Sequence, residues 1–266
     1  MTEGILRAHR EGIVTSTTIT ANMPAAAAAA GRLADAPRLG VGVHLNVSQG
    51  PPLTREALAL ADEDGVMRRT AVSVMAACVR HPRLLDTVAA ECEAQIRWAL
   101  DRGVVVTHLD SHRHVHGFPP IFARVAALAR RYDIRFVRWH REVLAPGGWP
   151  ACPPTQRCVR WLTNLCGASN ALLAGSLGRA RGTWGIAHTG RIDAAWLIRA
   201  AAAARPGVTE IMTHPGLPDG LDETVTRLRA SRQAELGALC DPAVKDAFAR
   251  HEIELVHYGQ LPSARA

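Results

Sequence analysis

Residues 107–116 most constrain what this chain can fold into. The segment reads Thr-His-Leu-Asp-Ser-His-Arg-His-Val-His and holds four of the chain's twelve histidines within nine residues. The apolar run 103–106 precedes it, and Pro119 and Pro120 follow it. A short β-branched run after a glycine is typical of a buried strand, and a proline pair is typical of the first turn of a helix. We therefore predict that the histidines lie on a strand-to-helix loop, at the carboxyl end of a strand.

This pattern favours metal chemistry. Neutral imidazole is a good ligand for divalent metals, and a carboxylate adds negative charge. In an extended segment alternate side chains share a face, so His108, Asp110 and His112 would point one way. His112, His114 and His116 would also share a face. The alternative is a solvated, histidine-rich surface loop, which is disfavoured because the cluster follows a buried strand directly.

Strands and helices alternate along the rest of the chain. Besides the strand entering the histidine segment, hydrophobic patterns predict strands at 13–20, 39–46, 134–138, 182–186, 208–216 and 253–257. They predict helices at 3–10, 25–30, 71–80, 84–100, 121–131, 155–177, 193–204, 222–239 and 242–250, with loops at 51–69 and a mobile turn cluster at 146–150. No internal linker interrupts this order. We predict a single α/β domain over residues 1–266, with a mostly parallel sheet or barrel and helices outside.

Four sites fall at the carboxyl ends of predicted strands: His44, the segment 110–116, Arg138 and His214. In a parallel barrel those ends meet on one face, which is where ligands bind. A lone histidine on a strand is usually structural, but a second cluster at another strand end favours a shared site. Arg138 is a cation that could hold a substrate or pair with a carboxylate, and we group His116 with it as substrate-binding.

Composition argues against two classes of partner. The net charge is +7 and the pI is about 9.7, but Lys245 is the only lysine and the arginines are scattered. Arginine in place of lysine, with abundant alanine, is typical of a GC-rich genome, so we expect no nucleic-acid partner. No apolar run is long enough to cross a bilayer, and the first ten residues are too charged for a secretory signal. We expect a cytoplasmic protein without a membrane partner.

Cysteine and serine chemistry are also disfavoured. The six cysteines contain no C-x-x-C pair, so we expect reduced thiols, and we place Cys158 in the core near Trp161 and Leu162. No G-x-S-x-G elbow is present, and Ser111 lies inside the histidine segment rather than on such a turn, which argues against a serine hydrolase.

Four stretches together resemble the YdjC-like (ChbG/HpnK) carbohydrate deacetylase family. They are Gly-Ile-Val-Thr-Ser-Thr-Thr at 12–18, Gly-Val-His-Leu at 42–45, the histidine segment at 107–116, and Thr-His-Pro-Gly at 213–216. They span almost the whole chain in family order. The block His-Leu-Asp-Ser-His-x-His-Val-His is the most specific of them.

The resemblance implies a distorted (β/α) TIM-like barrel and a metal-dependent hydrolase. Such an enzyme removes acetyl groups from N-acetylated amino sugars such as chitooligosaccharides. By this resemblance His44 and His112 are the metal ligands, for Mg²⁺ or Zn²⁺. His214 is a general acid at the mouth of the site, and Asp110 belongs to the catalytic set by orienting a ligand histidine. The partner would be a small carbohydrate. Oligomeric state is not readable from the sequence, and we carry a homodimer as the commonest assembly.

The sequence departs from the family pattern at its beginning. Family members start with a strand that ends in an Asp-Asp-Phe-Gly type motif, which supplies a metal ligand and the proposed base. This sequence begins just beyond that point, and Glu3 is no convincing substitute. We expect a start codon set too far downstream, or else a true truncation. The sequence as given is then expected to hold metal weakly and turn over slowly, and the alternative function is a catalytically impaired sugar-binding or vestigial family member.

Overall fold

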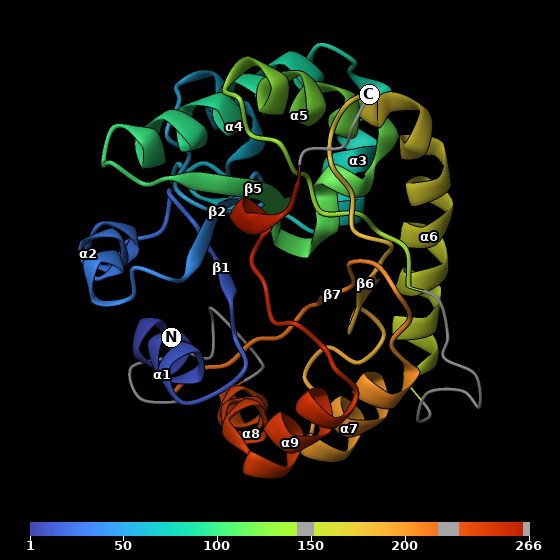
Figure 1. Cartoon of the computed structure of the whole chain (residues 1–266). Coiled ribbons are helices and arrows are strands. Elements are labelled where there is room, and N and C mark those ends of the chain that lie inside the picture. Colours follow the sequence, from blue (N-terminus) through green and yellow to red (C-terminus); the bar gives the residue numbers. More distant parts are fainter. Residues whose placement is uncertain (143–151, 218–228, 263–266) are drawn as a thin grey trace.

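A computed structural model describes residues 1–142, 152–217 and 229–262. Its helices form an outer ring and its strands lie inside that ring (Figure 1). The α-helices are α1 (Thr2–Arg10), α2 (Ala26–Gly31), α3 (Ala71–Arg80), α4 (Leu84–Leu100), α5 (Pro119–Arg131), α6 (Pro154–Ala174), α7 (Ala194–Ala203), α8 (Arg229–Cys240) and α9 (Pro242–Arg250). Short 3-10 helices are η1 (Leu33–Asp35), η2 (Glu56–Leu60), η3 (His112–Gly117) and η4 (Tyr258–Gln260).

Parallel strands form the centre of the fold. The sheet order is β1 (Ser16–Ile19), β2 (Gly40–Leu45) and β5 (Val106–Ser111), with β2 in the middle. Single parallel bridges continue this arrangement from Leu109 to Val137 and from Phe136 to Gly178. Two further pairs stand apart: parallel β6 (Thr183–Trp184) with β7 (Glu210–Ile211), and antiparallel β3 (Gln49–Gly50) with β4 (Met67–Arg68).

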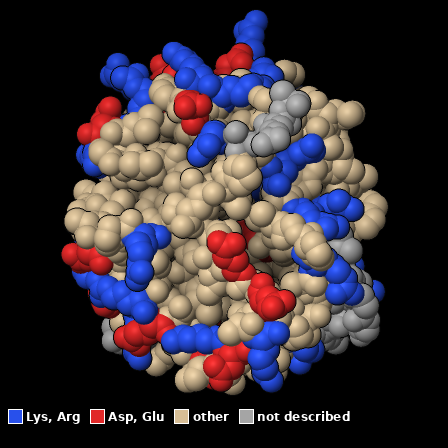
Figure 2. Space-filling model, in the orientation of Figure 1, with Lys and Arg blue, Asp and Glu red and all other residues tan. Residues whose placement is uncertain are grey.

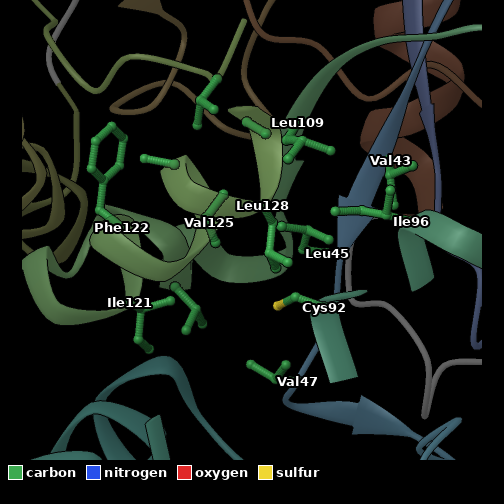
Figure 3. Close-up of a cluster of buried hydrophobic side chains, with 14 of the residues drawn as sticks. Val43, Leu45, Val47, Cys92, Ile96, Leu109, Ile121, Phe122, Val125 and Leu128 are labelled. Carbon is green, nitrogen blue, oxygen red and sulfur yellow. The ribbon is translucent and has the colours of Figure 1, made fainter. Parts of the chain in front are cut away.

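Alternation along β2 and β5 separates the core from the site. Val43, Leu45 and Leu109 are fully buried and point to the helical side of the sheet. There they pack against α4 and α5 through residues such as Ile96 and Phe122 (Figure 3). The intervening residues of these strands face the other way, because side chains on a strand alternate between its two faces. That second face carries the histidines and Asp110.

Local sequence explains where several helices begin. Thr70 and Ser73 form a reciprocal capping box at the start of α3. The side chains of Asp193 and Asp241 accept backbone hydrogen bonds at the starts of α7 and α9. α5 begins with the proline pair, as the sequence predicts, because proline already has a helical φ and lacks an N–H that the first turn would leave unpaired.

The structure confirms the α/β class and the parallel strands but differs in detail from the sequence prediction. No closed barrel is found in the described part of the chain. The predicted strand at 134–138 makes only isolated bridges, and 253–257 is irregular and leads into η4. The predicted loop at 51–69 contains η2 and β4. The predicted turn cluster at 146–150 and the first part of the helix predicted at 222–239 lie outside the described residues.

Two other expectations need correction. The strand entering the histidine segment runs from 106 to 111, not 103 to 106, so His108 and Asp110 lie on the strand itself. Cys158 is exposed rather than in the core, because it lies on the outward side of α6. All six cysteines are unpaired in the structure.

The surface has no single basic patch on the face shown in Figure 2. Arginine side chains lie around its margin with acidic side chains among them. No helix within the described ranges has the length and apolar content needed to cross a membrane.

The inner face of the sheet is filled closely, and Gly42 shows how closely. A Cβ atom on Gly42 would lie 2.6 Å from Cε1 of His108, whose ring stacks on Tyr258 with centroids 4.3 Å apart. Contacts that short do not occur, so the absence of a side chain at position 42 lets the His108 ring occupy this space. The sheet therefore requires glycine here for packing.

We predict that Gly42→Ala lowers the free energy of unfolding by roughly 1–3 kcal/mol, because the added methyl group overpacks the inner face. Gly237→Ala is the matched control, since that glycine lies within α8 with no neighbour near the added atom. The control should raise stability by about 0.5–1 kcal/mol. Chemical denaturation of both variants measures the difference, and equal effects would contradict the packing argument.

Candidate active site

The site begins with a histidine–carboxylate pair on neighbouring strands. His44 on β2 and Asp110 on β5 are direct partners in the strand register, so their side chains lie side by side on the same face. Nδ1 of His44 lies 2.8 Å from Oδ1 of Asp110 and 3.4 Å from Oγ1 of Thr18. A carboxylate on Nδ1 fixes the ring so that Nε2 is the remaining nitrogen. His44 therefore presents Nε2 away from Asp110.

A buried arginine holds the other side of Asp110. Nη1 of Arg138 lies 2.6 Å from Oδ2 of Asp110. Its Nε and Nη2 donate to Oε1 of Glu210 on β7 at 2.8 and 2.6 Å, and Thr183 on β6 donates to the second oxygen of Glu210 at 2.9 Å. The guanidinium group is thus occupied on both sides. We call the connected residues His44, Asp110, Arg138 and Glu210 the charge relay.

Electrostatics keep the two carboxylates and the guanidinium group of the relay ionised. Burial alone would raise the pKa of Asp110, but Arg138 and His44 outweigh it and hold that pKa well below its usual range. Burial likewise opposes ionisation of Glu210, and Arg138 again lowers the pKa below the ordinary glutamate value. The same carboxylates raise the pKa of Arg138 despite its burial. Each charge is therefore stabilised by its neighbour in the relay.

The chain turns sharply after β5. Arg113 and His114 adopt left-handed conformations, with φ of 54° and 59°, inside η3. The extended spacing predicted for 112, 114 and 116 is therefore wrong, and these side chains do not share one strand face. The turn sends them in different directions.

His116 is bound by the protein on both ring nitrogens. Its Nδ1 lies 2.5 Å from Oγ of Ser111, and its Nε2 lies 3.2 Å from the carbonyl oxygen of Arg138. Beside it, His114 and His140 form a hydrogen bond of 3.0 Å between their rings. The rings of His114, His116 and His140 thus pack together, and we call them the histidine layer.

His112 lies on the other side of the turn, toward His44. The two rings meet edge to face with centroids 5.7 Å apart. Nε2 of His112 is buried and has no hydrogen-bond partner among the described residues. Burial, with His44 and Arg113 nearby, lowers the pKa of His112 to about 3, so the ring is neutral at pH 7. A buried neutral imidazole with a free lone pair is suited to ligating a cation.

His214 follows β7 and is placed by Glu235 from α8. The backbone N–H of His214 donates to Oε2 of Glu235 at 2.6 Å, and Gly190 N–H donates to Oε1 at 3.2 Å. Nδ1 of the His214 ring is buried without a partner in the described part of the chain. Burial, Arg232 and Arg138 lower the pKa of His214 to about 3, while Asp110 acts in the opposite direction.

His44 and His112 fit two positions of a divalent-metal site. In His44, Nδ1 is bonded to Asp110, so Nε2 is the nitrogen left to bind an ion. In His112, Nε2 is buried without a hydrogen-bond partner among the described residues. Catalytic zinc sites use three protein ligands, however, and the described residues contain no group of three histidine, cysteine or acidic side chains placed to hold one ion. Two imidazole nitrogens alone are fewer ligands than such a site uses.

Most of the predicted site residues come together in space. Asp110 contacts both His44 and Arg138, and the ring of His112 meets that of His44 edge to face. His214 lies close enough to His44 and Asp110 for both to influence its pKa. Arg138, predicted to bind substrate, is instead occupied by two carboxylates, and His116 by Ser111 and a carbonyl.

Sequence reasoning missed three residues around this site: Glu210, Glu235 and His140. Glu210 carried a signal, because an acidic residue inside the β-branched run 208–213 is unusual for a buried strand. His140 lies two residues beyond Arg138, on the same side of an extended segment. Glu235 gave none, since an acidic residue on an amphipathic helix is ordinarily on its solvated face.

The chain is similar in sequence to known proteins over most of its length. A family profile described as YdjC-like protein matches residues 1–250. A carbohydrate deacetylase of Brevibacillus brevis is 31% identical over 97% of this chain and 92% of its own length. One from Halalkalibacterium halodurans is 42% identical, but over 49% of this chain and 54% of its own length.

A solved structure shows the same fold. It belongs to a candidate cellobiose-phosphate cleavage protein of Enterococcus faecalis V583, with a TM-score of 0.76 and 22% identity. The match covers 97% of this chain and 91% of that one.

We predict that Arg138→Met lowers the free energy of unfolding by about 3–5 kcal/mol, because it leaves Asp110 and Glu210 as uncompensated buried charges. Arg124→Met is the matched control, since Arg124 pairs with Asp86 in the open. The control should cost no more than about 1 kcal/mol. Urea unfolding at pH 7 compares them, and a small loss for Arg138→Met would mean that the relay contributes little to stability.

We predict that Glu235 makes the free energy of unfolding depend on pH. Burial raises its pKa to about 7, whereas an unfolded glutamate has a pKa of about 4.3. The folded state therefore binds this proton more tightly, and the stability it contributes is complete below pH ~4 and is lost as the pH rises through ~7. Glu235→Gln should remove a fall in unfolding free energy on the order of 3 kcal/mol across that range.

Unfolding curves of the wild type and Glu235→Gln at half-unit pH steps test this. The control is Glu254→Gln at an exposed position, which should leave the pH dependence unchanged. Parallel curves for the wild type and Glu235→Gln would show that Glu235 has an ordinary pKa in the folded protein.

Proposed function

The chain belongs to the YdjC-like protein family, and from that membership we propose that it is a carbohydrate deacetylase. The reaction is hydrolysis of the amide bond of an N-acetylated amino sugar, such as a chitooligosaccharide, to acetate and a free amine. The family match over residues 1–250 carries the proposal. It is supported by relatives named carbohydrate deacetylase, among them those of Brevibacillus brevis and Vibrio cholerae. The expected setting is the cytoplasm.

In this proposal His44 and His112 hold a divalent metal ion, Mg²⁺ or Zn²⁺. A bound divalent ion would supply polarisation of the acetyl carbonyl and a more acidic water. Asp110 keeps His44 in the tautomer whose Nε2 is free, and Arg138 and Glu210 fix Asp110. Arg138 is thus a positioning residue that acts through Asp110, because its guanidinium is already occupied.

His214 is the proposed general acid. When water adds to the acetyl carbon, the C–N bond breaks and the leaving amine needs a proton. In the resting site Arg232 and Arg138 oppose protonation of the His214 ring. The neutral His214 ring can take the proton that the attacking water releases and pass it to the leaving amine, and negative charge that develops on the substrate raises the proton affinity of the ring during this transfer. Glu235 fixes the backbone on which this ring is carried.

The direct test measures acetate released from N-acetylglucosamine and from short chitooligosaccharides. The protein is first stripped with EDTA and then supplied with Mg²⁺ or Zn²⁺. Acetate release that depends on added metal supports the proposal. Sugar binding by calorimetry without acetate release, under every metal condition, would instead favour the catalytically impaired sugar-binding family member.

Two substitutions separate the proposed roles. His112→Ala should abolish metal retention and acetate release together, because it removes one of two imidazole ligands. His214→Ala should lower kcat by about 10²–10⁴-fold with metal content unchanged, since it removes only proton transfer. Elemental analysis and the acetate assay measure both, with exposed His251→Ala as control. Metal loss in His214→Ala would make His214 a ligand, and unchanged turnover in His112→Ala would remove that residue from the site.

A further inference from the structure

The turn after β5 is strained at Arg113. Its φ of 54° lies in the left-handed region, and His114 follows with a φ of 59°. Positive φ is uncommon for residues other than glycine, and arginine has no short side chain that favours it. Such a conformation persists only where the surrounding structure holds the residue in it. The turn therefore requires a contact that holds Arg113.

The guanidinium group of Arg113 makes that contact. Its Nη1 donates a hydrogen bond to the backbone carbonyl oxygen of Arg69, which lies just before α3. Arg113 is exposed, so burial of its side chain does not impose the conformation. The hydrogen bond instead joins the turn to a segment that precedes it by more than forty residues in the sequence.

The acceptor residue is itself held in place. Arg69 directly follows the antiparallel pair β3 and β4, and we call these two strands together with Arg69 the site ribbon. The backbone N–H of Arg69 donates to the carbonyl oxygen of Ser48 at 2.9 Å. Its Nε donates to the carbonyl oxygen of Leu60 at 2.6 Å. The main chain and the side chain of Arg69 are thus both bonded, which fixes the carbonyl oxygen that Arg113 binds.

The site ribbon is anchored to the strand that carries His44. The Gln95 amide on α4 accepts from the N–H of Asn46 at 2.8 Å and donates to its carbonyl oxygen at 2.7 Å, as a neighbouring strand would. Glu91 accepts from Nε2 of Gln95 at 2.8 Å, which fixes the direction of that amide. Oδ1 of Asn46 in turn accepts from the N–H of Ser48 at 3.2 Å. Asn46 is two residues beyond His44, so the same fixed backbone carries the His44 ring and leads into the ribbon.

The position of His112 depends on the turn. Nε2 of its ring has no hydrogen-bond partner among the described residues, so no bond at that atom fixes the ring. The ring meets that of His44 edge to face, with centroids 5.7 Å apart. His112 directly precedes Arg113, so the backbone that Arg113 ties to the site ribbon also carries the His112 ring.

From these contacts we propose that Arg113 is a positioning residue, whose hydrogen bond to Arg69 holds the left-handed turn in the conformation that places His112 against His44. The site ribbon then serves as a common support for two histidines that come from different strands. The catalytic consequence rests on the proposed function, in which these two histidines are the metal ligands.

Direct binding of the sugar is the competing role for an exposed arginine beside the site. Loss of a sugar contact would raise KM and leave kcat unchanged, because that contact stabilises the bound substrate and the transition state equally. A positioning residue acts on the reacting group through His112, so its loss lowers kcat and leaves KM close to the wild-type value. The bond from Arg113 to the Arg69 carbonyl favours the positioning role.

The acetate assay separates these roles. Arg113→Met should lower kcat by roughly 10–100-fold, because a small displacement of a catalytic group has an effect of that size. Arg113→Lys should recover most of this loss, since an ammonium group can donate to the same carbonyl oxygen. Arg10→Met is the matched control: Arg10 is also exposed and donates to a distant carbonyl oxygen, that of Asp35 at 3.4 Å, away from the site. A raised KM with unchanged kcat in Arg113→Met would identify a sugar contact and overturn the proposal.

Arg113→Gly separates the side chain from the backbone strain. Glycine adopts a left-handed φ without strain but cannot make the bond to Arg69. It should therefore lose kcat as Arg113→Met does, with unchanged circular dichroism in both variants. Wild-type kcat in Arg113→Gly would show that the guanidinium group is not needed, and would overturn the proposal.

Proton NMR of the EDTA-treated protein locates the His112 ring without substrate or metal. The ring current of His112 shifts the ring protons of His44, and comparison of the wild type with His112→Ala measures that shift. Arg113→Met and Arg113→Gly should lose most of it, whereas Arg113→Lys and Arg10→Met should keep it.

The NMR comparison also separates this inference from the proposed function. A wild type that releases no acetate, but whose His44 shifts depend on Arg113, would reject the deacetylase and support the positioning role. Unchanged His44 shifts in Arg113→Met and Arg113→Gly would overturn the positioning role, whether or not acetate is released.

Discussion

The burial of one guanidinium group between two carboxylates is the constraint on which the site depends. Arg138 contacts Asp110 and Glu210 at 2.6 Å each; Asp110 lies on β5, Arg138 in the segment after α5, and Glu210 on β7. A buried charge needs a partner of opposite sign, so the three segments are kept in fixed relation. The orientation of His44 follows, because Arg138 holds one oxygen of Asp110 and the other oxygen faces Nδ1 of the His44 ring. Stability and the orientation of His44 thus depend on the same contacts.

Much of this arrangement could be predicted from the sequence. The helices at 71–80 and 84–100 agree with α3 and α4, because apolar spacing and capping residues are local signals. The parallel strands and the meeting of His44, Asp110 and Arg138 follow from a general property of α/β folds, in which carboxyl ends of strands lie together. These predictions hold whether the sheet is open or closed into a barrel.

The parts that could not be predicted depend on contacts distant in sequence. Glu210 reaches Arg138 across seventy-two residues, and nothing near either residue announces the pairing. The left-handed turn at Arg113 and His114 is equally hidden, since no glycine marks it and positive φ is uncommon for any other residue. The extended interpretation of 112–116 assumes that strand alternation continues through these residues. The turn ends that alternation, so the interpretation is wrong. Cys158 shows the same limit for helix α6, whose apolar side faces outward.

The segment that follows the left-handed turn packs against helix α6, and so does His140 of the histidine layer. The carbonyl of His140 lies so close to Gly167 of α6 that no side chain would fit there, and Asn170 holds the carbonyl of Gly117 at the end of η3. A small shift or rotation of α6 would therefore displace His140, and the hydrogen bond between the two rings would transmit that displacement to His114. The positions of the site histidines therefore depend in part on a peripheral helix, and restricting the motion of that helix would also restrict theirs.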